Sequence, residues 1–195
     1  LGGSGQLQNT NDLNLGEGGK LKLSAVSVAK VITSADSSGI EIENDSTISN
    51  FVVGNITPVS IASGKSLSGS IAVNTGGKLQ FSNTGTLASA ISMNGGKLEA
   101  KESLTISGEL IQSGNISIAV DSQKILTFDS NQILTEANQL TIEGNGTVAF
   151  PTNASGIVLN NPAGLLRLEG SGTLDAAKVN AASDPGKGIL VNETR

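Results

Sequence analysis

The residues whose types and spacing come closest to a chemical site are three alternating carboxylates, Glu41, Glu43 and Asp45. Alternate side chains of an extended strand point to the same face, so these carboxylates would share one face while Ile40 and Ile42 occupy the other. Carboxylate oxygens are the ligands that Ca²⁺ prefers. The sequence therefore offers Glu41, Glu43 and Asp45 as a candidate calcium or ligand face, with an ordinary solvated strand face as the alternative.

Most other chemistry is limited by residue types that the chain lacks. None of its 195 residues is His, Cys, Trp or Tyr. Without His or Cys there are no imidazole or thiolate metal sites, no serine-type triads and no disulfides. Polysaccharide hydrolysis needs paired carboxylates in a cleft and usually aromatic platforms for the sugar rings. We therefore assign no catalytic residue and no cofactor.

The charge distribution argues against nucleic acid as a partner. The formal net charge is −5, and the 12 Lys and Arg residues are scattered without a basic run. A chain that binds phosphate backbones normally presents a basic patch. The apolar runs are only a few residues long, so this segment is expected to contain no membrane span.

The elements that would position any site are short strands. Gly accounts for 25 residues, while Phe accounts for only four and Met for one. Apolar residues alternate with Ser, Thr, Lys, Glu or Asn, which is the period of a half-buried strand. The alternating apolar positions are Leu21/Leu23, Ile40/Ile42, Ile71/Val73, Leu79/Phe81, Ile91/Met93, Leu98/Ala100, Leu104/Ile106, Ile116/Ile118/Val120, Leu126/Phe128, Leu140/Ile142, Val148/Phe150 and Leu166/Leu168.

A double-glycine phrase recurs at a regular spacing. The three copies read GEGGKLKL, NTGGKLQF and NGGKLEA, with glycine pairs at Gly18–Gly19, Gly76–Gly77 and Gly95–Gly96. The last two pairs are separated by one unit of about 20 residues, and the first two by close to three such units. We expect these glycines, together with Gly146 and Gly172 of two Gly-x-Gly phrases, to form turns between strands.

A unit of about 20 residues that repeats along a chain is typical of a solenoid. The unit contains strands and glycine corners, with no room for a helix. The sequence therefore predicts an all-β fold, a right-handed parallel β-helix of roughly ten coils, in which each coil supplies two or three strands. Residues 1–195 are expected to form one such domain, and a β-sandwich array is the alternative fold.

The repeated phrases also resemble those of a known family. NGGKLEAKESLTISG (Asn94 to Gly108), with GGKLKLS and GGKLQFS, is similar to the autotransporter-associated β-strand repeats of bacterial type V secretion passengers, in which a double Gly and a Thr or Lys precede alternating apolar residues. The resemblance implies a fragment of a longer passenger that a C-terminal β-barrel carries across the outer membrane. It also implies a location at the bacterial cell surface or a secreted product.

These observations favour a non-enzymatic adhesin or structural stalk. Its partner would be a host-cell surface protein or glycan, or another copy of the chain. A polysaccharide-binding or polysaccharide-degrading β-helix that uses Glu41, Glu43 or Asp45 is the alternative. A fibre-like trimer segment is a third interpretation.

Overall fold

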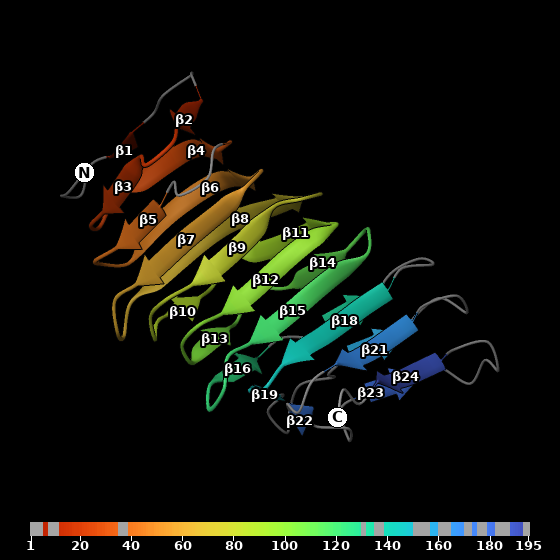
Figure 1. Ribbon diagram of the computed structural model, residues 1–195. Helices are drawn as coiled ribbons and strands as arrows, with labels where there is room; N and C mark the ends of the chain where they lie inside the picture. The colour runs from red at the N-terminus through yellow and green to blue at the C-terminus, as the bar shows by residue number, and fades with distance from the viewer. Residues whose placement is uncertain are drawn as a thin grey trace.

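The chain is wound into a stack of parallel β-strands. The computed structural model describes residues 12–34, 39–129 and 139–149, and the backbone of the strands at 6–7, 132–134, 157–159, 165–169, 173–174, 179–181 and 188–192. All strand pairs in these residues are parallel, and none of these residues lies in a helix. The N- and C-terminal strands lie at opposite ends of the stack (Figure 1). The predicted all-β parallel solenoid is thus confirmed.

One sheet contains nine strands and faces the viewer in Figure 1. In spatial order these strands are β3 (Lys20–Leu23), β5 (Gly39–Ile42), β7 (Ile56–Ile61), β9 (Lys78–Phe81), β12 (Gly96–Ala100), β15 (Ile116–Val120), β18 (Gln139–Gly144), β21 (Leu165–Glu169) and β24 (Gly188–Asn192). Each coil contributes one strand to this sheet, so the described strands correspond to nine coils, slightly fewer than the sequence predicts.

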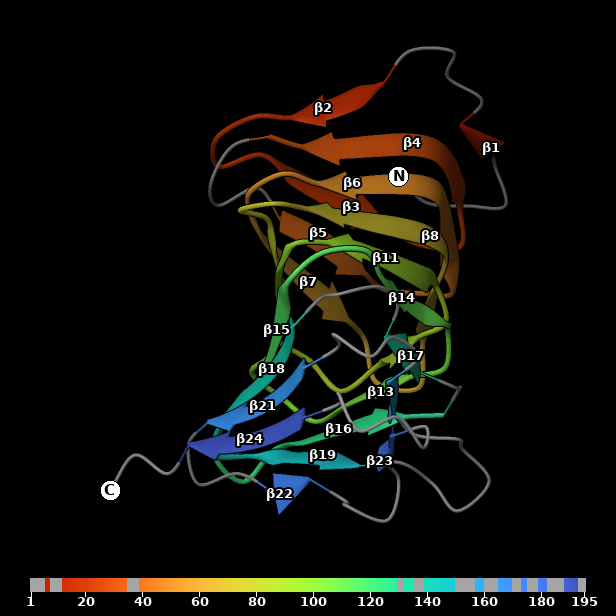
Figure 2. The ribbon, with the colours of Figure 1, turned by 90° about the vertical axis from the view of Figure 1, so that its right-hand side faces the viewer.

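The other sheet contains fifteen strands and wraps around the remaining two sides of the stack (Figure 2). In three early coils a single long strand covers both sides; these strands are β4 (Ser27–Thr33), β6 (Ser46–Val53) and β8 (Ser66–Asn74). Later coils have one short strand on each side. The strands of one side are β10 (Thr86–Leu87), β13 (Leu104–Ile106), β16 (Ile125–Phe128), β19 (Thr147–Ala149) and β22 (Thr173–Leu174). Those of the other side are β11 (Ala90–Asn94), β14 (Leu110–Gln112), β17 (Gln132–Leu134), β20 (Ile157–Leu159) and β23 (Val179–Ala181), while β1 (Gln6–Leu7) and β2 (Leu13–Leu15) both pair with β4.

The long strands bend where they pass from one side of the stack to the other. In β6 the inward residues Ile48 and Phe51 are three positions apart instead of two, and the register with β8 shifts between them. Gly69 of β8 lies at this bend with a φ of 112°, and a Cβ there would collide with the Ile48 carbonyl. Because the bend interrupts the alternation of apolar residues, the sequence pattern does not reveal these long strands.

The repeated phrases stack directly on one another. Lys78 of β9 is in register with Lys97 of β12, as is Leu79 with Leu98, so the spacing of the last two phrases is the length of one coil. The first and second phrases begin β3 and β9, which are three coils apart, as the threefold longer spacing between them predicts. Later coils are longer, since more residues separate Ile116 from its partner Leu140, and Leu140 from its partner Leu166.

The two glycines differ in conformation in the first two pairs, whereas in the third pair both have a positive φ, which is 111° at Gly96. The first has a positive φ, which is 67° at Gly18, 80° at Gly76 and 76° at Gly95. The second is crowded by backbone, because an added Cβ would lie 2.9 Å from a carbonyl oxygen at Gly19, 2.5 Å at Gly77 and 2.7 Å at Gly96. At Gly77 that oxygen belongs to Val53 in the preceding coil. Of the other turn glycines predicted, Gly146 is also crowded by backbone, and Gly172 lies outside the described residues.

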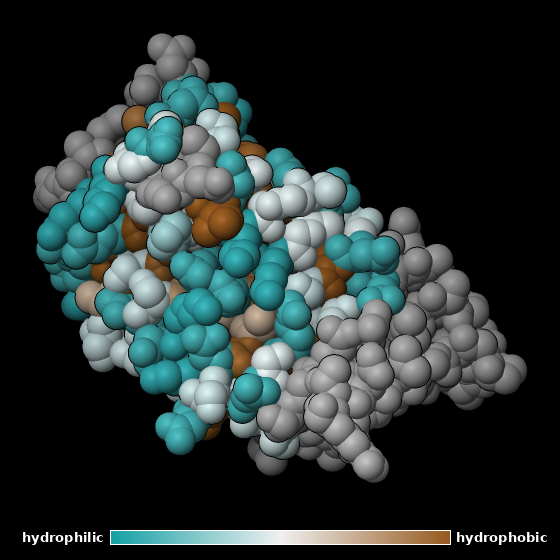
Figure 3. All heavy atoms as spheres, viewed as in Figure 1, coloured by the Kyte–Doolittle hydropathy of each residue, from teal (hydrophilic) through white to brown (hydrophobic). Residues whose placement is uncertain are grey.

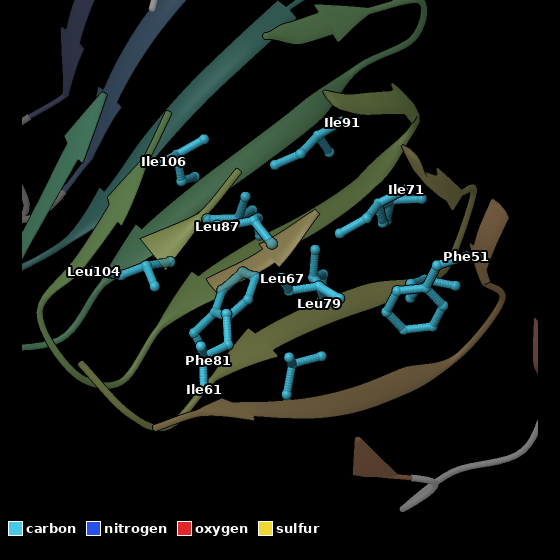
Figure 4. Close-up of a cluster of buried hydrophobic side chains, with 14 of the residues drawn as sticks. Phe51, Ile61, Leu67, Ile71, Leu79, Phe81, Leu87, Ile91, Leu104 and Ile106 are labelled. Carbon is cyan, nitrogen blue, oxygen red and sulfur yellow. The ribbon is translucent and has the colours of Figure 1, made fainter. Parts of the chain in front are cut away.

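The interior is a column of aliphatic side chains with a few phenylalanines. Leu67, Leu87 and Ile106 are stacked in register on successive strands, and each is 0% exposed. Side chains from both sheets, including Phe81 and Ile71, point into the same space (Figure 4). Burial of this continuous apolar ladder is what holds neighbouring coils together.

Candidate functional site

Two of the three candidate carboxylates share one lysine. Glu41 lies on the outer face of β5, and Glu43 follows the end of that strand; both are exposed. Lys22 of the neighbouring strand β3 places its Nζ 2.7 Å from Glu43 Oε1 and 3.6 Å from Glu41 Oε1. Hydrogen bonding to Glu43, with the charges of both carboxylates, raises the pKa of Lys22 above its ordinary value.

Asp45 has a different partner. It accepts hydrogen bonds from the Ser66 hydroxyl at 2.9 Å and the Ser66 backbone N–H at 2.8 Å, both at the start of β8 in the next coil. The hydroxyl bond first, and then the backbone bond, lower the pKa of Asp45. Strand β5 ends at Ile42, so the expected alternation does not continue to Asp45.

The three carboxylates therefore do not meet around one point. Within the described residues no group of three acidic side chains is arranged to hold a metal ion. Instead, each carboxylate contacts a group on a neighbouring coil. Glu41, Glu43 and Asp45 lie on the surface, as the sequence indicates, but their geometry links coils together.

A second polar cluster lies further along the same sheet, centred on Glu99. This residue points outward from β12, yet it is only 8% exposed because neighbouring polar side chains cover it. Gln80 Nε2 donates to Glu99 Oε2 at 2.6 Å, Lys101 Nζ lies 3.2 Å from Oε1, and Lys78 Nζ lies 3.6 Å from Oε2. Burial raises the pKa of Glu99, but the bonds from Gln80 and Lys101 and the nearby ammonium charges outweigh it, so the pKa is lowered.

The repeated phrases contain a signal for this cluster. Aligning GGKLKL, GGKLQF and GGKLEA places Lys22, Gln80 and Glu99 at the same outward position. Gln80 and Glu99 are indeed paired in register. Residues at equivalent positions of neighbouring coils in a solenoid are close in space, so the alignment alone is enough to predict their contact.

A shallow hollow lies on the outer face of the nine-stranded sheet, over β3, β5 and β7. Its volume is about 240 Å³. The residues that line it are Lys20, Leu21, Lys22, Gly39, Ile40, Glu41, Pro58, Ser60 and Ser82. Hydrophilic side chains cover much of this face of the molecule (Figure 3). Of the predicted site residues, only Glu41 lines the hollow.

Apolar side chains form a row on the outer surface of one side of the fifteen-stranded sheet. Ile32, Val52 and Ala72 are in register on β4, β6 and β8, and none of them is buried. The row continues through Ser92 to Ile111, which is 41% exposed. This outward row, which is aliphatic except for Ser92, was not predicted, because the sequence pattern does not give the register of one coil on the next.

The described residues contain no helix with the length and hydropathy needed to cross a membrane. Comparisons of the chain with protein-family models, with curated proteins and with solved structures find no match.

Proposed function

We propose that this chain is a non-enzymatic β-solenoid that acts as a structural stalk or adhesin. The proposal includes a bacterial cell-surface or secreted location and an autotransporter-type passenger role. Its partner would be a host-cell surface protein, a glycan or another copy of the chain. The repeated double-glycine phrases and the stacked coils support this assignment.

The main support for the proposal is that most of the salt bridges on the surface join one coil to another. Seven of the eight salt bridges among the described residues join side chains from different coils. Many side-chain hydrogen bonds do the same, such as Asn44 Nδ2 to Ser24 Oγ at 2.7 Å. Polar groups that connect successive coils add to the cohesion of the stack along its axis. A stalk needs this cohesion, because it must resist tension or hold two surfaces at a fixed distance.

The pKa values of the carboxylates do not favour glycan hydrolysis, which is the alternative function. A general acid needs a carboxyl whose pKa is raised so that it stays protonated near neutral pH. Asp45, Glu99 and Glu143 instead have lowered pKa values, because hydrogen bonds and lysine charges stabilise their ionised forms. The lowered pKa values therefore favour a structural role for these three carboxylates over a role as general acid.

A change in the number of coils tests the stalk directly. The segment from 78 to 96 spans one coil, because Lys78 and Lys97 are in register. Deleting it joins Gly77 to Lys97, and duplicating it places a second copy before Lys97, so both junctions read GGKL. We expect both variants to fold, with a length that changes by about 4.8 Å per coil in small-angle scattering.

Display on bacterial cells then measures the function. We expect adhesion to host cells, or cell-to-cell aggregation, to rise or fall with coil number. The matched control is an insertion of the same segment, 78 to 96, in scrambled order, which cannot form a coil and should lose both folding and adhesion. If the coil variants fold but leave adhesion and aggregation at the level of cells that lack the protein, the stalk or adhesin assignment is wrong.

A further inference from the structure

Gly39 lines the hollow over β3, β5 and β7 without a side chain of its own. Its φ lies outside the left-handed region, and a Cβ added there would have only Pro58 O at 3.7 Å, an ordinary contact. Neither the backbone angle nor the available space therefore requires glycine. Any larger side chain at this outward position would project into the hollow.

The neighbour of Gly39 across the sheet is also unusual. Pro58 lies within β7, which has strands on both sides, and Pro cannot donate a ladder hydrogen bond. Gly and Pro are both depleted in strands. Gly also begins β12 and β24 of this sheet, so the proline inside β7 is the stronger departure from local sequence rules, of the kind that functional sites show.

The polar groups around this floor are of both signs. Lys20 is exposed and forms no salt bridge with any described residue. Glu41 is 57% exposed at its side chain and only 3.6 Å from Lys22, whose closer partner is Glu43 at 2.7 Å. Glu41 therefore keeps acceptor capacity, and Ser60 adds a hydroxyl.

We propose that this hollow binds a single sugar residue that carries a carboxylate, such as one hexuronic acid unit of an acidic glycan. The Lys20 ammonium would hold the sugar carboxylate, while Glu41 and Ser60 hydrogen-bond ring hydroxyls. The pyrrolidine ring of Pro58 supplies the apolar surface beneath the sugar. The volume of about 240 Å³ is below the roughly 300–1,000 Å³ of pockets for drug-sized ligands, so one sugar unit is the appropriate size.

This site rests on the glycan partner of the proposed function and specifies its class, but sugar binding does not depend on the stalk role. A stalk with an empty hollow remains a stalk. If the coil-number experiment fails, sugar binding in the hollow can still be measured and remains a valid result. The two proposals therefore stand or fall on separate measurements.

The test is an NMR titration of the isotope-labelled chain with D-glucuronate, with glucose and acetate as separate arms. We expect glucuronate to shift the amide signals of Gly39, Glu41 and Ser60, with a dissociation constant on the order of 1 mM, as suits a small ligand on an open site. Lys20→Gln should weaken binding about tenfold, the loss of one charge-assisted hydrogen bond. The matched control Lys65→Gln removes a lysine away from the hollow and should leave binding unchanged.

Gly39→Val is the decisive variant, because its Cβ would meet no atom closer than Pro58 O at 3.7 Å, its methyl groups would project into the hollow, and Val is a good strand former. We expect it to abolish the glucuronate shifts while the melting temperature stays the same or rises. Equal shifts with glucose would overturn the role of Lys20, and equal shifts with acetate would show a carboxylate bound without a sugar site. Unchanged glucuronate binding in a folded Gly39→Val variant would place the ligand elsewhere.

Discussion

Lys97 and Glu143 form a salt bridge of 2.8 Å although their strands are not paired with each other. Lys97 is on β12, Glu143 is on β18, and β15 lies between them. The residue in register between Glu99 and Glu143 is Ala119, which is only 7% exposed on this outer face. A small side chain at this position leaves room for the bridge. Coils that are not neighbours are thereby coupled, which a nearest-neighbour description of a solenoid omits.

We expect Glu143→Gln to lower the free energy of unfolding by about 0.5–1 kcal/mol, the upper range for a partly exposed ion pair. Ala119→Val, which narrows the path of the bridge, should have a similar effect. Urea denaturation measures both. Glu109→Gln is the control, since Glu109 is exposed and forms no salt bridge with the described residues. Equal losses for Glu143→Gln and Glu109→Gln would mean that the bridge contributes nothing.

The double glycine at 76 and 77 should respond differently to each substitution. Gly76 has a φ of 80° and open space around its Cβ position, so Gly76→Ala should cost about 1–2 kcal/mol of backbone strain. Asn tolerates this conformation, and Gly76→Asn should recover part of the loss.

Gly77→Ala meets the Val53 carbonyl oxygen at 2.5 Å and should cost more, with no recovery in Gly77→Asn. Thermal unfolding of the four variants provides the comparison. Similar losses of stability at both positions, or a recovery of stability in Gly77→Asn, would contradict this assignment, in which Gly76 is needed for its positive φ and Gly77 for its lack of a Cβ.

A buried pair of hydroxyls on successive coils offers a double-mutant cycle. Thr57 Oγ1 donates to Thr33 Oγ1 at 2.6 Å, and both residues are 0% exposed. Either single change to Val leaves the other hydroxyl buried with fewer partners, and we expect each to cost about 1–2 kcal/mol. The double variant Thr33→Val/Thr57→Val should cost less than the sum, because no hydroxyl is left behind. Strict additivity in urea denaturation would show that the two hydroxyls do not interact.

The lowered carboxylate pKa values predict acid sensitivity. When the pKa of a carboxyl is lower in the folded than in the unfolded state, its ionisation stabilises the fold. This stabilisation is complete at pH values above the unfolded-state pKa, which is about 4.3 for Glu. That stability is lost as the pH falls through the folded-state pKa. The urea midpoint should therefore decline from about pH 5 downward. In Glu99→Gln the decline should be shallower, although Asp45 and Glu143 preserve part of it. An unchanged pH profile in this variant would contradict the role of Glu99.

The fold was predicted well where alternation and glycine phrases agree. The spacing from Gly77 to Gly96 correctly gave one coil, and the spacing from Gly19 to Gly77 gave three. The long strands β4 and β6 were missed and β8 was predicted only at Ile71 and Val73, because a strand that bends around a corner loses its period of two. The pattern records which way each side chain points only while the strand is straight.

The site was harder to foresee because it depends on contacts between coils. Alternation placed Glu41 outward, but it did not show that Lys22 lies across from Glu41 and Glu43, or that Asp45 binds Ser66. The members of such pairs lie on successive coils, and coil length decides which residues meet. Only where the phrases can be aligned, as for Gln80 and Glu99, does the sequence contain that register.

The lengthening of the coils toward the C-terminal end of the stack has a practical consequence for engineering. The paired strands keep their parallel ladder while the connections between them absorb the additional chain. A foreign peptide grafted between β15 and β16 should therefore be carried as cargo, with the ladder intact beneath it. Several grafts on neighbouring coils would form a row at strand spacing, which makes the chain a scaffold for multivalent display.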